Sequence, residues 1–293
     1  MEPLLPRLRS GRPILADGAM GTMLMEWGLK GGQSPEAMML EDPAQIEAVT
    51  RLYIGAGAEM IQTNTFGASP IKLALSKLQD RTEEIIRRAL EIAKNTARSY
   101  VYIAASCGPT GRLLKPYGDL EPAELNRSCE RQIRLIAAHG ADAICVETMT
   151  DINEAVVFVR AAKTIAPKIP VFATMTFDPT PRGFFTVMGV TIEKAVSELS
   201  KAGADALGAN CGQGSDTMIE IARVFKKVTD KPLVIRPNAG LPILDHGKTL
   251  YPETPDYFAD NCAELARLGV CVIGGCCGTT PAHIRAAAKA LHL

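Results

Sequence analysis

The sequence predicts an α/β protein, a single-domain (β/α)8 barrel over residues 1–293, in which parallel strands alternate with helices. Short apolar runs without polar alternation recur along the chain, as expected for parallel strands buried on both faces. Segments with helical periodicity separate these runs. A glycine stands between a helix and the next strand at four junctions, where it allows the left-handed conformation of a helix C-terminus. These glycines are Gly57, Gly140, Gly203 and Gly269.

The expected strands cover residues 14–17, 60–63, 101–105, 143–146, 171–174, 206–209, 233–235 and 270–273. Helices are expected between Asp42 and Gly57, near 81–98, 122–138, 151–164, 191–202 and 215–228, and after Pro281. Asp151 and Glu154 have the spacing of a capping box for their helix, and Thr280 is placed to cap the last one. Residues 24–40 are expected to be irregular.

A doubly wound open sheet is the alternative fold for this alternation of strands and helices. No Gly-x-Gly-x-x-Gly or Walker-type phosphate loop follows any expected strand, which favours the barrel. No stretch has the composition of a linker, so residues 1–293 are expected to form one domain.

The composition excludes several classes of function. Lys plus Arg and Asp plus Glu number 32 each, so a mainly electrostatic nucleic-acid or membrane partner is not expected. Eight cysteines in 293 residues do not make a disulfide-dense chain. The sequence contains neither a signal peptide nor an apolar run that could span a bilayer. A cytoplasmic protein with reduced thiols is therefore expected.

Two adjacent cysteines between glycines are the most unusual local feature. Cys276 and Cys277 lie in the run Gly274–Pro281, and Cys211 follows another apolar run in a similar glycine-containing turn. Three thiolates from two strand ends would suit zinc with its fourth position open, the arrangement of a catalytic site. Free cysteines are also frequent core residues, and a vicinal pair can form a strained redox disulfide. Local context alone leaves these alternatives open.

Polar residues gather at or just after the carboxyl ends of the expected strands, where barrel enzymes place their chemistry. Each has a structural explanation by itself, as a helix cap, a turn residue or a strand residue. As a set they predict a site in the mouth of the barrel. The set comprises Asp17, Thr63, Glu147, Asn210, Cys211, Asn238, Cys276 and Cys277.

Seven short runs together carry a resemblance to a known family. They are Asp17-Gly18-Ala19-Met20-Gly21-Thr22, Gln62-Thr63-Asn64-Thr65-Phe66-Gly67, Gly108-Pro109-Thr110-Gly111, Glu147-Thr148, Asn210-Cys211, Pro237-Asn238-Ala239-Gly240 and Gly274-Gly275-Cys276-Cys277-Gly278. In these runs the chain resembles the homocysteine S-methyltransferase family, and most of all the homocysteine-binding domain of cobalamin-dependent methionine synthases. The resemblance spans about residues 10–290, and the cysteine pattern together with the Asp17 run is its most specific part.

The resemblance implies a metal site and a substrate. Cys211, Cys276 and Cys277 would be the catalytic zinc ligands, and the sulfur of homocysteine would take the open position as a thiolate. It also implies that carboxylates receive the substrate ammonium and that backbone N–H groups receive its carboxylate. The implied substrate contacts are Asp17, Glu147, Gly18, Ala19 and Thr63, with Asn238 a candidate for the fourth zinc ligand when homocysteine is absent.

The methyl donor is expected to be a methylcorrinoid, methylcobalamin, carried by a separate corrinoid protein or by a cobalamin-binding module that would make this chain a fragment. This follows from the likeness of the loop Gly108–Gly118 to the bacterial methionine-synthase branch. A small donor, S-methylmethionine or betaine, is the alternative. Betaine-using relatives carry a tyrosine where this chain has Gly67, which counts against betaine. A zinc-stabilised binding barrel without catalysis is a further alternative, disfavoured by the presence of Asp17 and Glu147.

Overall fold

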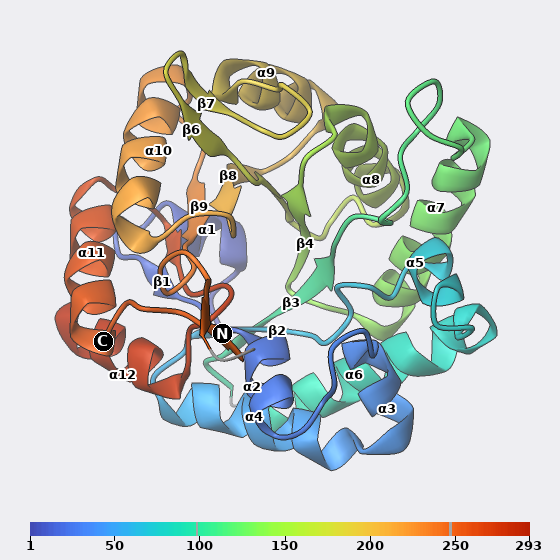
Figure 1. Ribbon diagram of the computed structural model, residues 1–293, viewed down its shortest axis with the longest axis horizontal. Coiled ribbons are helices and arrows are strands. Elements are labelled where there is room, and N and C mark those ends of the chain that lie inside the picture. The colour runs from blue at the N-terminus through green and yellow to red at the C-terminus, as the bar shows by residue number, and fades with distance from the viewer. Residues whose placement is uncertain (98, 246–247) are drawn as a thin grey trace.

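The protein is a barrel of eight parallel strands surrounded by helices, seen in a computed structural model that describes residues 1–97, 99–245 and 248–293 (Figure 1). The strands run in the order β1-β12-β9-β8-β5-β4-β3-β2. They are β1 (Ile14–Leu15), β2 (Met60–Gln62), β3 (Tyr102–Cys107), β4 (Ala143–Met149), β5 (Val171–Met175), β8 (Ala206–Asn210), β9 (Leu233–Arg236) and β12 (Val272–Ile273). The fold class expected from the sequence is confirmed.

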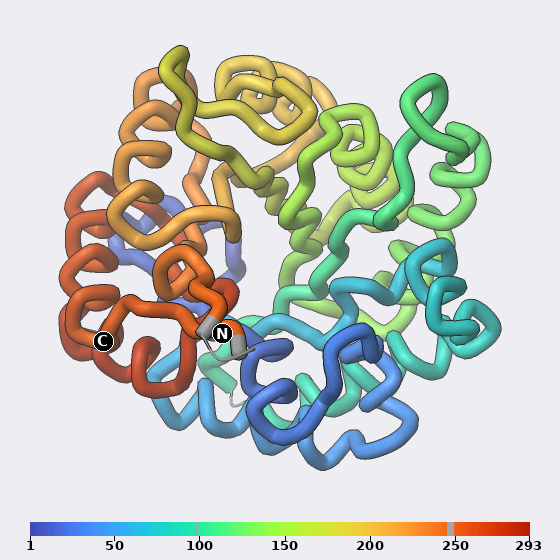
Figure 2. Tube along the Cα trace, viewed as in Figure 1, coloured from blue at the N-terminus to red at the C-terminus, as the bar shows by residue number. Residues whose placement is uncertain are grey.

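The barrel closes where the first strand meets both the second and the last. Ile14 and Leu15 pair in parallel with Val272 and Ile273 of β12. On the other side of β1 a parallel bridge joins Ala16 to Met60 at the start of β2. The amino-terminal and carboxyl-terminal segments consequently lie side by side, as the tube in Figure 2 shows by its neighbouring blue and red ends.

Helices form the outer layer. The main ones are α4 (Pro43–Gly55), α6 (Thr82–Thr96), α7 (Pro122–His139), α8 (Ile152–Ile165), α9 (Ile192–Ala202), α10 (Ser215–Val228), α11 (Pro255–Arg267) and α12 (Pro281–Ala290). Shorter helical segments are α1 (Leu4–Leu8), α2 (Met20–Glu26), η1 (Pro35–Ala37), α3 (Met38–Glu41), α5 (Pro70–Ala74) and η2 (Gln79–Arg81). Each glycine expected between a helix and the next strand has a positive φ, for example 105° at Gly203.

The strands are apolar on both faces because each face meets a different core. Outward residues such as Leu207 and Ile235 pack against the helices. Inward residues such as Met60, Phe172 and Val234 fill the barrel, and α1 closes its amino-terminal end with Leu4 and Leu8. This double burial is the physical reason for the continuous apolar runs in the sequence.

Two local expectations are wrong. The segment 24–40 contains the end of α2, η1 and the start of α3, because buried Leu24 and Met39 anchor these short helices in the core. Asp151 accepts a hydrogen bond from the N–H of Asn153, but Glu154 does not complete a capping box. Its carboxylate instead accepts from the N–H of Thr110 at 2.7 Å, so it anchors the loop after β3. Residue 98, the last of one expected helix, lies outside the described residues.

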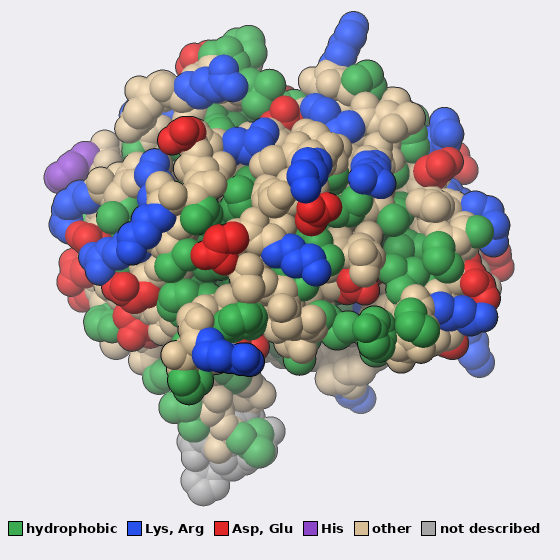
Figure 3. All heavy atoms as spheres, turned by 90° about the horizontal axis from the view of Figure 1, so that it is seen from above, with side chains coloured by type: hydrophobic (Ala, Val, Ile, Leu, Met, Phe, Trp, Pro, Cys, Tyr) green, Lys and Arg blue, Asp and Glu red, His purple; other side chains and the backbone are tan. Residues whose placement is uncertain are grey.

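Two of the longer loops each contain a pair of short antiparallel strands. The segment after β5 forms β6 (Asp178–Thr180) and β7 (Gly183–Phe185), and the segment after β9 forms β10 (Ile243–Asp245) and β11 (Lys248–Leu250). The surface carries both signs of charge, and Figure 3 shows Lys and Arg interspersed with Asp and Glu on one face. Among the described residues, no helix combines the length and apolarity needed to cross a membrane.

Close contact between β8 and β9 gives a test of the barrel packing. A Cβ at Gly208 would lie 1.8 Å from the carbonyl oxygen of Val234, a backbone atom that cannot move aside. We expect Gly208→Ala to lower the free energy of unfolding by at least about 1–3 kcal/mol, the usual cost of overpacking. Denaturant titration monitored by circular dichroism measures it.

The matched control is Gly55→Ala at the end of α4. A Cβ there would meet no atom within 4 Å apart from its chain neighbours and the backbone of its own helix, so stability should hold or rise by no more than about 1 kcal/mol. Equal unfolding midpoints for the two variants would contradict the packing described.

Candidate active site

A cavity of about 560 Å³ opens at the carboxyl ends of the barrel strands. Eight of the ten site residues expected from the sequence line it, all except Asn210 and Asn238. Those eight are Asp17, Gly18, Ala19, Thr63, Glu147, Cys211, Cys276 and Cys277. The volume is within the range of small-molecule sites. Residues far apart in the sequence therefore meet in one place.

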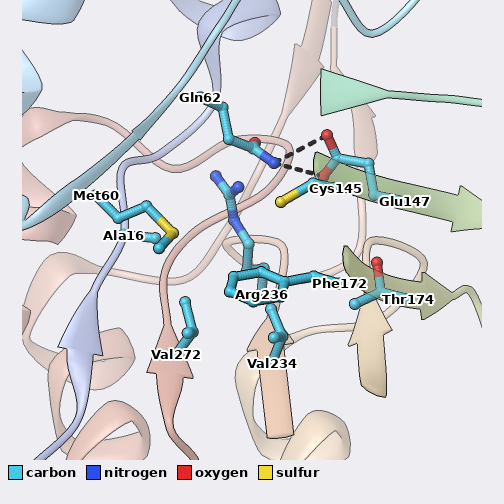
Figure 4. A pocket seen from close by; sticks show the side chains of 10 residues that line it. All are labelled: Ala16, Met60, Gln62, Cys145, Glu147, Phe172, Thr174, Val234, Arg236 and Val272. Atoms are coloured by element: carbon cyan, nitrogen blue, oxygen red, sulfur yellow. Dashed lines mark hydrogen bonds between the residues drawn. The ribbon is translucent and has the colours of Figure 1, made fainter. Parts of the chain in front are cut away.

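The floor of this cavity belongs to a layer of polar side chains, of which Gln62, Ser106, Glu147 and Arg236 line the cavity. Each stands two residues after an inward residue of its strand and so shares that residue's inward direction, since strand side chains alternate. Figure 4 shows four of them, together with apolar side chains of the interior, around a second, small cavity of about 10 Å³. The layer comprises Gln62, Ser106, Glu147, Thr174, Asn210 and Arg236, from six strands.

The three cysteines expected to form a metal site are brought together. Cys211 follows β8, and Cys276 and Cys277 follow β12. Their sulfur atoms all lie within 4.8 Å of one another, and the sulfurs of Cys211 and Cys277 are 3.8 Å apart. All three are free thiols and partly buried, so the vicinal pair is not a disulfide here.

This donor set fits a tetrahedral cation. Two thiolates held at about 2.3 Å from zinc in tetrahedral geometry lie about 3.8 Å apart, as observed for Cys211 and Cys277. Hydrogen bonding to Cys211, together with burial, raises the pKa of the Cys276 thiol to about 12 when no cation is present. Three neighbouring thiolates therefore need a bound cation at neutral pH, and binding would release their protons.

Asn238 lies beside the cysteine pair, although it does not line the cavity. The carbonyl of Pro237 accepts from the N–H of Cys276 at 2.7 Å, and the N–H of Ala239 donates to the carbonyl of Cys277 at 3.0 Å. Asn238 Oδ1 is buried and has no hydrogen-bond partner among the described residues. A buried carbonyl oxygen without a partner is costly, and a metal ion is one group that could satisfy it.

Two strained residues shape the metal side of the site. Thr148 and Cys211 have φ values of 58° and 62°, which residues other than glycine rarely adopt. The side chain of Asn210 bonds the turn at Thr148 and reaches the turn of the cysteine pair. Its Oδ1 accepts from the N–H of Thr148 at 2.8 Å and the hydroxyl of Thr174 at 2.6 Å, and its Nδ2 lies 3.8 Å from Cys276 Sγ. Strain of this kind persists where the surroundings fix it, as at functional sites.

The two carboxylates expected to bind an ammonium group line the same cavity and share one partner, Gln62. Its backbone N–H donates to Asp17 Oδ2 at 2.7 Å, and its Nε2 donates to both oxygens of Glu147 at 2.9 Å (Figure 4). Ser106 also donates to Glu147. Both carboxylates are more than nine-tenths buried yet line the cavity, so their positions are fixed before a ligand arrives.

The other expected substrate contacts are only partly free. The N–H of Ala19 donates to Thr279, at 3.2 Å to Oγ1 and 3.3 Å to the carbonyl oxygen. The hydroxyl of Thr63 lies 2.6 Å from that of Thr65 and accepts from the N–H of Ser106 at 3.3 Å. Gly18 packs too closely on Thr279 and on Tyr53 to carry a side chain, with a Cβ distance of 2.8 Å to each.

The sequence analysis assigned no role to Gln62, Ser106 or Arg236. The alternation of strand side chains could have predicted that they point into the barrel, because each follows an inward apolar residue by two positions. Arg236 was the clearest case, since it is a charged residue directly after the apolar run Leu233–Ile235.

The fold and this cavity define a class of protein, a (β/α)8 barrel with a three-cysteine cluster and paired carboxylates at the carboxyl ends of its strands. Residues 14–291 match the family model described as homocysteine S-methyltransferase. The chain belongs to the homocysteine S-methyltransferase family.

Individual relatives agree with this membership. The chain is 34% identical to a methionine synthase of Mycobacterium tuberculosis and 33% identical to one of Mycobacterium leprae, over 96% of its own length in both. It spans about a quarter of those proteins, 25% and 24% respectively. Among solved structures, the metallated homocysteine methyltransferase MmuM of Escherichia coli shares the fold, with a TM-score of 0.80 at 23% identity over 98% of this chain and 99% of that one.

Proposed function

We propose that this protein is a zinc-dependent methyltransferase that binds homocysteine and methylates its sulfur to give methionine. The observation that carries the proposal is the meeting of three thiols and two carboxylates in one cavity. Such a site offers a soft metal to a sulfur atom and negative charge to an ammonium group. Homocysteine carries both groups on one short chain.

Cys211, Cys276 and Cys277 are the residues that would hold zinc, with Asn238 as a candidate fourth ligand in the absence of substrate. A zinc ion in this site supplies positive charge that lowers the pKa of a thiol at the open position. The protein's part is to hold three sulfurs at tetrahedral spacing on two rigid strand ends. The strained turn at Cys211 and the bonds made by Asn210 maintain that spacing.

The amino-acid end of the substrate is assigned to the carboxylates of the cavity floor. Glu147 and Asp17 each keep acceptor capacity for an ammonium group beyond the bonds they already make. The N–H of Gly18 and the hydroxyl of Thr63 are assigned to the substrate carboxylate end, and Ala19 contributes by its position in the same turn. Fixed carboxylates and fixed thiols together orient the substrate sulfur.

The methyl donor in this proposal is a methylcorrinoid presented by another protein or module. The support is the similarity to methionine synthases, of which this chain spans about a quarter. The cavity opens at the strand ends, so a corrinoid would have to dock over the loops that surround them, including 108–118 and 178–190. A donor held on a separate module needs only a small, transient interface.

A small donor such as S-methylmethionine is the second candidate. The specific observation in its favour is that the E. coli homocysteine methyltransferase matches this barrel over 99% of its own chain. A cavity of about 560 Å³ also has room for more than homocysteine alone.

The metal assignment predicts about one zinc per chain in the purified protein. Replacing Cys211, Cys276 or Cys277 by alanine should each remove most of it, because two thiolates leave the cation poorly held. Metal analysis by mass spectrometry measures the content. Cys262→Ala and Cys271→Ala are controls away from the cavity and should keep the parent zinc content. Full zinc in any two of the three site variants would remove this site from consideration.

The substrate assignment predicts that Glu147→Gln keeps zinc but binds homocysteine more weakly. The loss should be roughly 1.5–3 kcal/mol, the size of a hydrogen bond to a charged group. Calorimetry on the zinc-loaded protein measures it. Glu154→Gln is the matched control, a buried carboxylate that bonds Thr110 outside the cavity, and should leave homocysteine affinity unchanged. Equal affinities for the parent and Glu147→Gln would leave Glu147 a structural role only.

The donor assignment predicts demethylation of methylcobalamin by the protein with homocysteine, seen as a change in the cobalamin absorption spectrum. The cobalamin should be supplied both free at high concentration and bound to a carrier protein. Parallel reactions with S-methylmethionine and with betaine are analysed for methionine. Methionine from a small donor without any demethylation of cobalamin would reverse the order of the two candidates.

A further inference from the structure

Arg236 is a buried cation at the centre of the cavity floor that the proposed function does not use. It ends β9, is 6% exposed and lines both the large cavity and the small one beneath it. Figure 4 shows its guanidinium extending from β9 into the barrel, toward the end of the Gln62 side chain. A buried guanidinium is expensive unless its partners compensate it, so its contacts indicate its role.

The guanidinium is bonded mainly to Asp17. Its Nη2 donates to Asp17 Oδ1 at 2.7 Å and to the carbonyl oxygen of the same residue at 3.1 Å. Its Nε donates to the carbonyl of Gly275 at 3.1 Å, next to the cysteine pair. Arg236 thus joins the first strand, which carries one substrate carboxylate, to the turn that carries two of the thiols.

Without a cation this floor would hold two buried carboxylates close together. Asp17 and Glu147 share Gln62, and burial raises the pKa of the Asp17 carboxyl, with Glu147 adding to the rise. Arg236 opposes it. The remaining titratable groups around Asp17 are Tyr53 and Cys145, whose pKa values burial raises so that both stay neutral. Among the described residues, Arg236 is therefore the one cation that faces Asp17.

We propose that Arg236 is a positioning residue that keeps Asp17 ionised and oriented, so that Asp17 and Glu147 can receive one ammonium group together. This rests on the proposed function, and it concerns the charge of the site. With Arg236 the floor carries two negative charges and one positive, which leaves a net negative charge for the ammonium. Each oxygen of Asp17 accepts one bond from the protein side chain or backbone and retains acceptor capacity for a ligand.

Arg236→Met removes the charge and keeps an apolar stem of similar length. Asp17 should then take up a proton at a higher pH than in the parent, because burial and Glu147 act on it without compensation. A carboxyl with a raised pKa is neutral below that pKa and ionised above it. Between about pH 6.5 and 8.5, homocysteine affinity should be lowest at the acidic end, roughly 10- to 150-fold below the parent, as for a lost bond to a charged group, and should rise with the pH.

The experiment compares homocysteine affinity by calorimetry across this pH range for zinc-loaded variants, with zinc content measured on each. Arg236→Lys keeps the positive charge and should remain within a few-fold of the parent at every pH. Asp17→Asn is compared with the double variant Asp17→Asn/Arg236→Met. If Arg236 acts through Asp17, the second substitution should cost no further affinity.

Three results would overturn the proposal. The first is an Arg236→Met affinity equal to that of the parent at all pH values. The second is a further loss in the double variant as large as that of Arg236→Met alone, which would mean that Arg236 contacts the substrate itself. The third is an affinity loss independent of pH and accompanied by loss of zinc, which would limit Arg236 to supporting the turn at Gly275.

The double variant and the comparison of the parent with Glu147→Gln cover the cases in which Arg236→Met alone gives no answer. If Arg236→Met does not fold, the double variant decides, since it leaves no unpaired charge at either position. The parent and Glu147→Gln separate this proposal from the proposed function. A parent that does not bind homocysteine overturns the function. A parent that binds it, with loss in Glu147→Gln and none of the expected behaviour at Arg236, overturns only the role of Arg236.

Discussion

Closure of the barrel through β1 is the constraint on which the site depends. This strand is two residues long, yet it pairs with β12 on one side and is bridged to Met60 on the other. Because all eight strands are parallel, closure brings their carboxyl ends to one rim. The carboxylate after β1 and the thiols after β12 are therefore neighbours, although more than 250 residues separate them in the chain.

The same constraint brings two sets of functional groups, thiols and carboxylates, to one rim. The thiols lie at the ends of β8 and β12, where positive φ angles and an asparagine with several partners fix their directions. The carboxylates lie on the side of β1, β2 and β4, held by one glutamine that bonds both. A substrate with a thiol at one end and an ammonium group at the other matches this pair of sets in one cavity. Arg236 connects the two sets through Asp17 and Gly275.

The layer of polar side chains at the carboxyl ends of the strands is both buried and fixed in position. Below this layer the interior is apolar and closed by α1, and above it the cavity is open. Buried polar groups are tolerated in the layer because nearly all of them bond one another. Asn238, which lies near the cysteines outside this layer, has a buried side-chain oxygen without a partner among the described residues, and a bound ligand would satisfy it. The site is thus largely formed before anything binds.

The sequence by itself determined the fold class, the cysteine set and eight of the residues that line the cavity. Apolar runs, glycine turns and polar residues at strand ends are local features, and parallel closure turns them into one rim. The sequence did not predict the short helices within 24–40 or the bond from Glu154 to Thr110, because packing against distant segments decides them. Tertiary structure alone decided that Asp17 is paired with Arg236 and that Asn210 bonds the turn at Thr148. Those contacts join residues 219 and 62 positions apart, and no local pattern specifies which partner a buried polar group will meet.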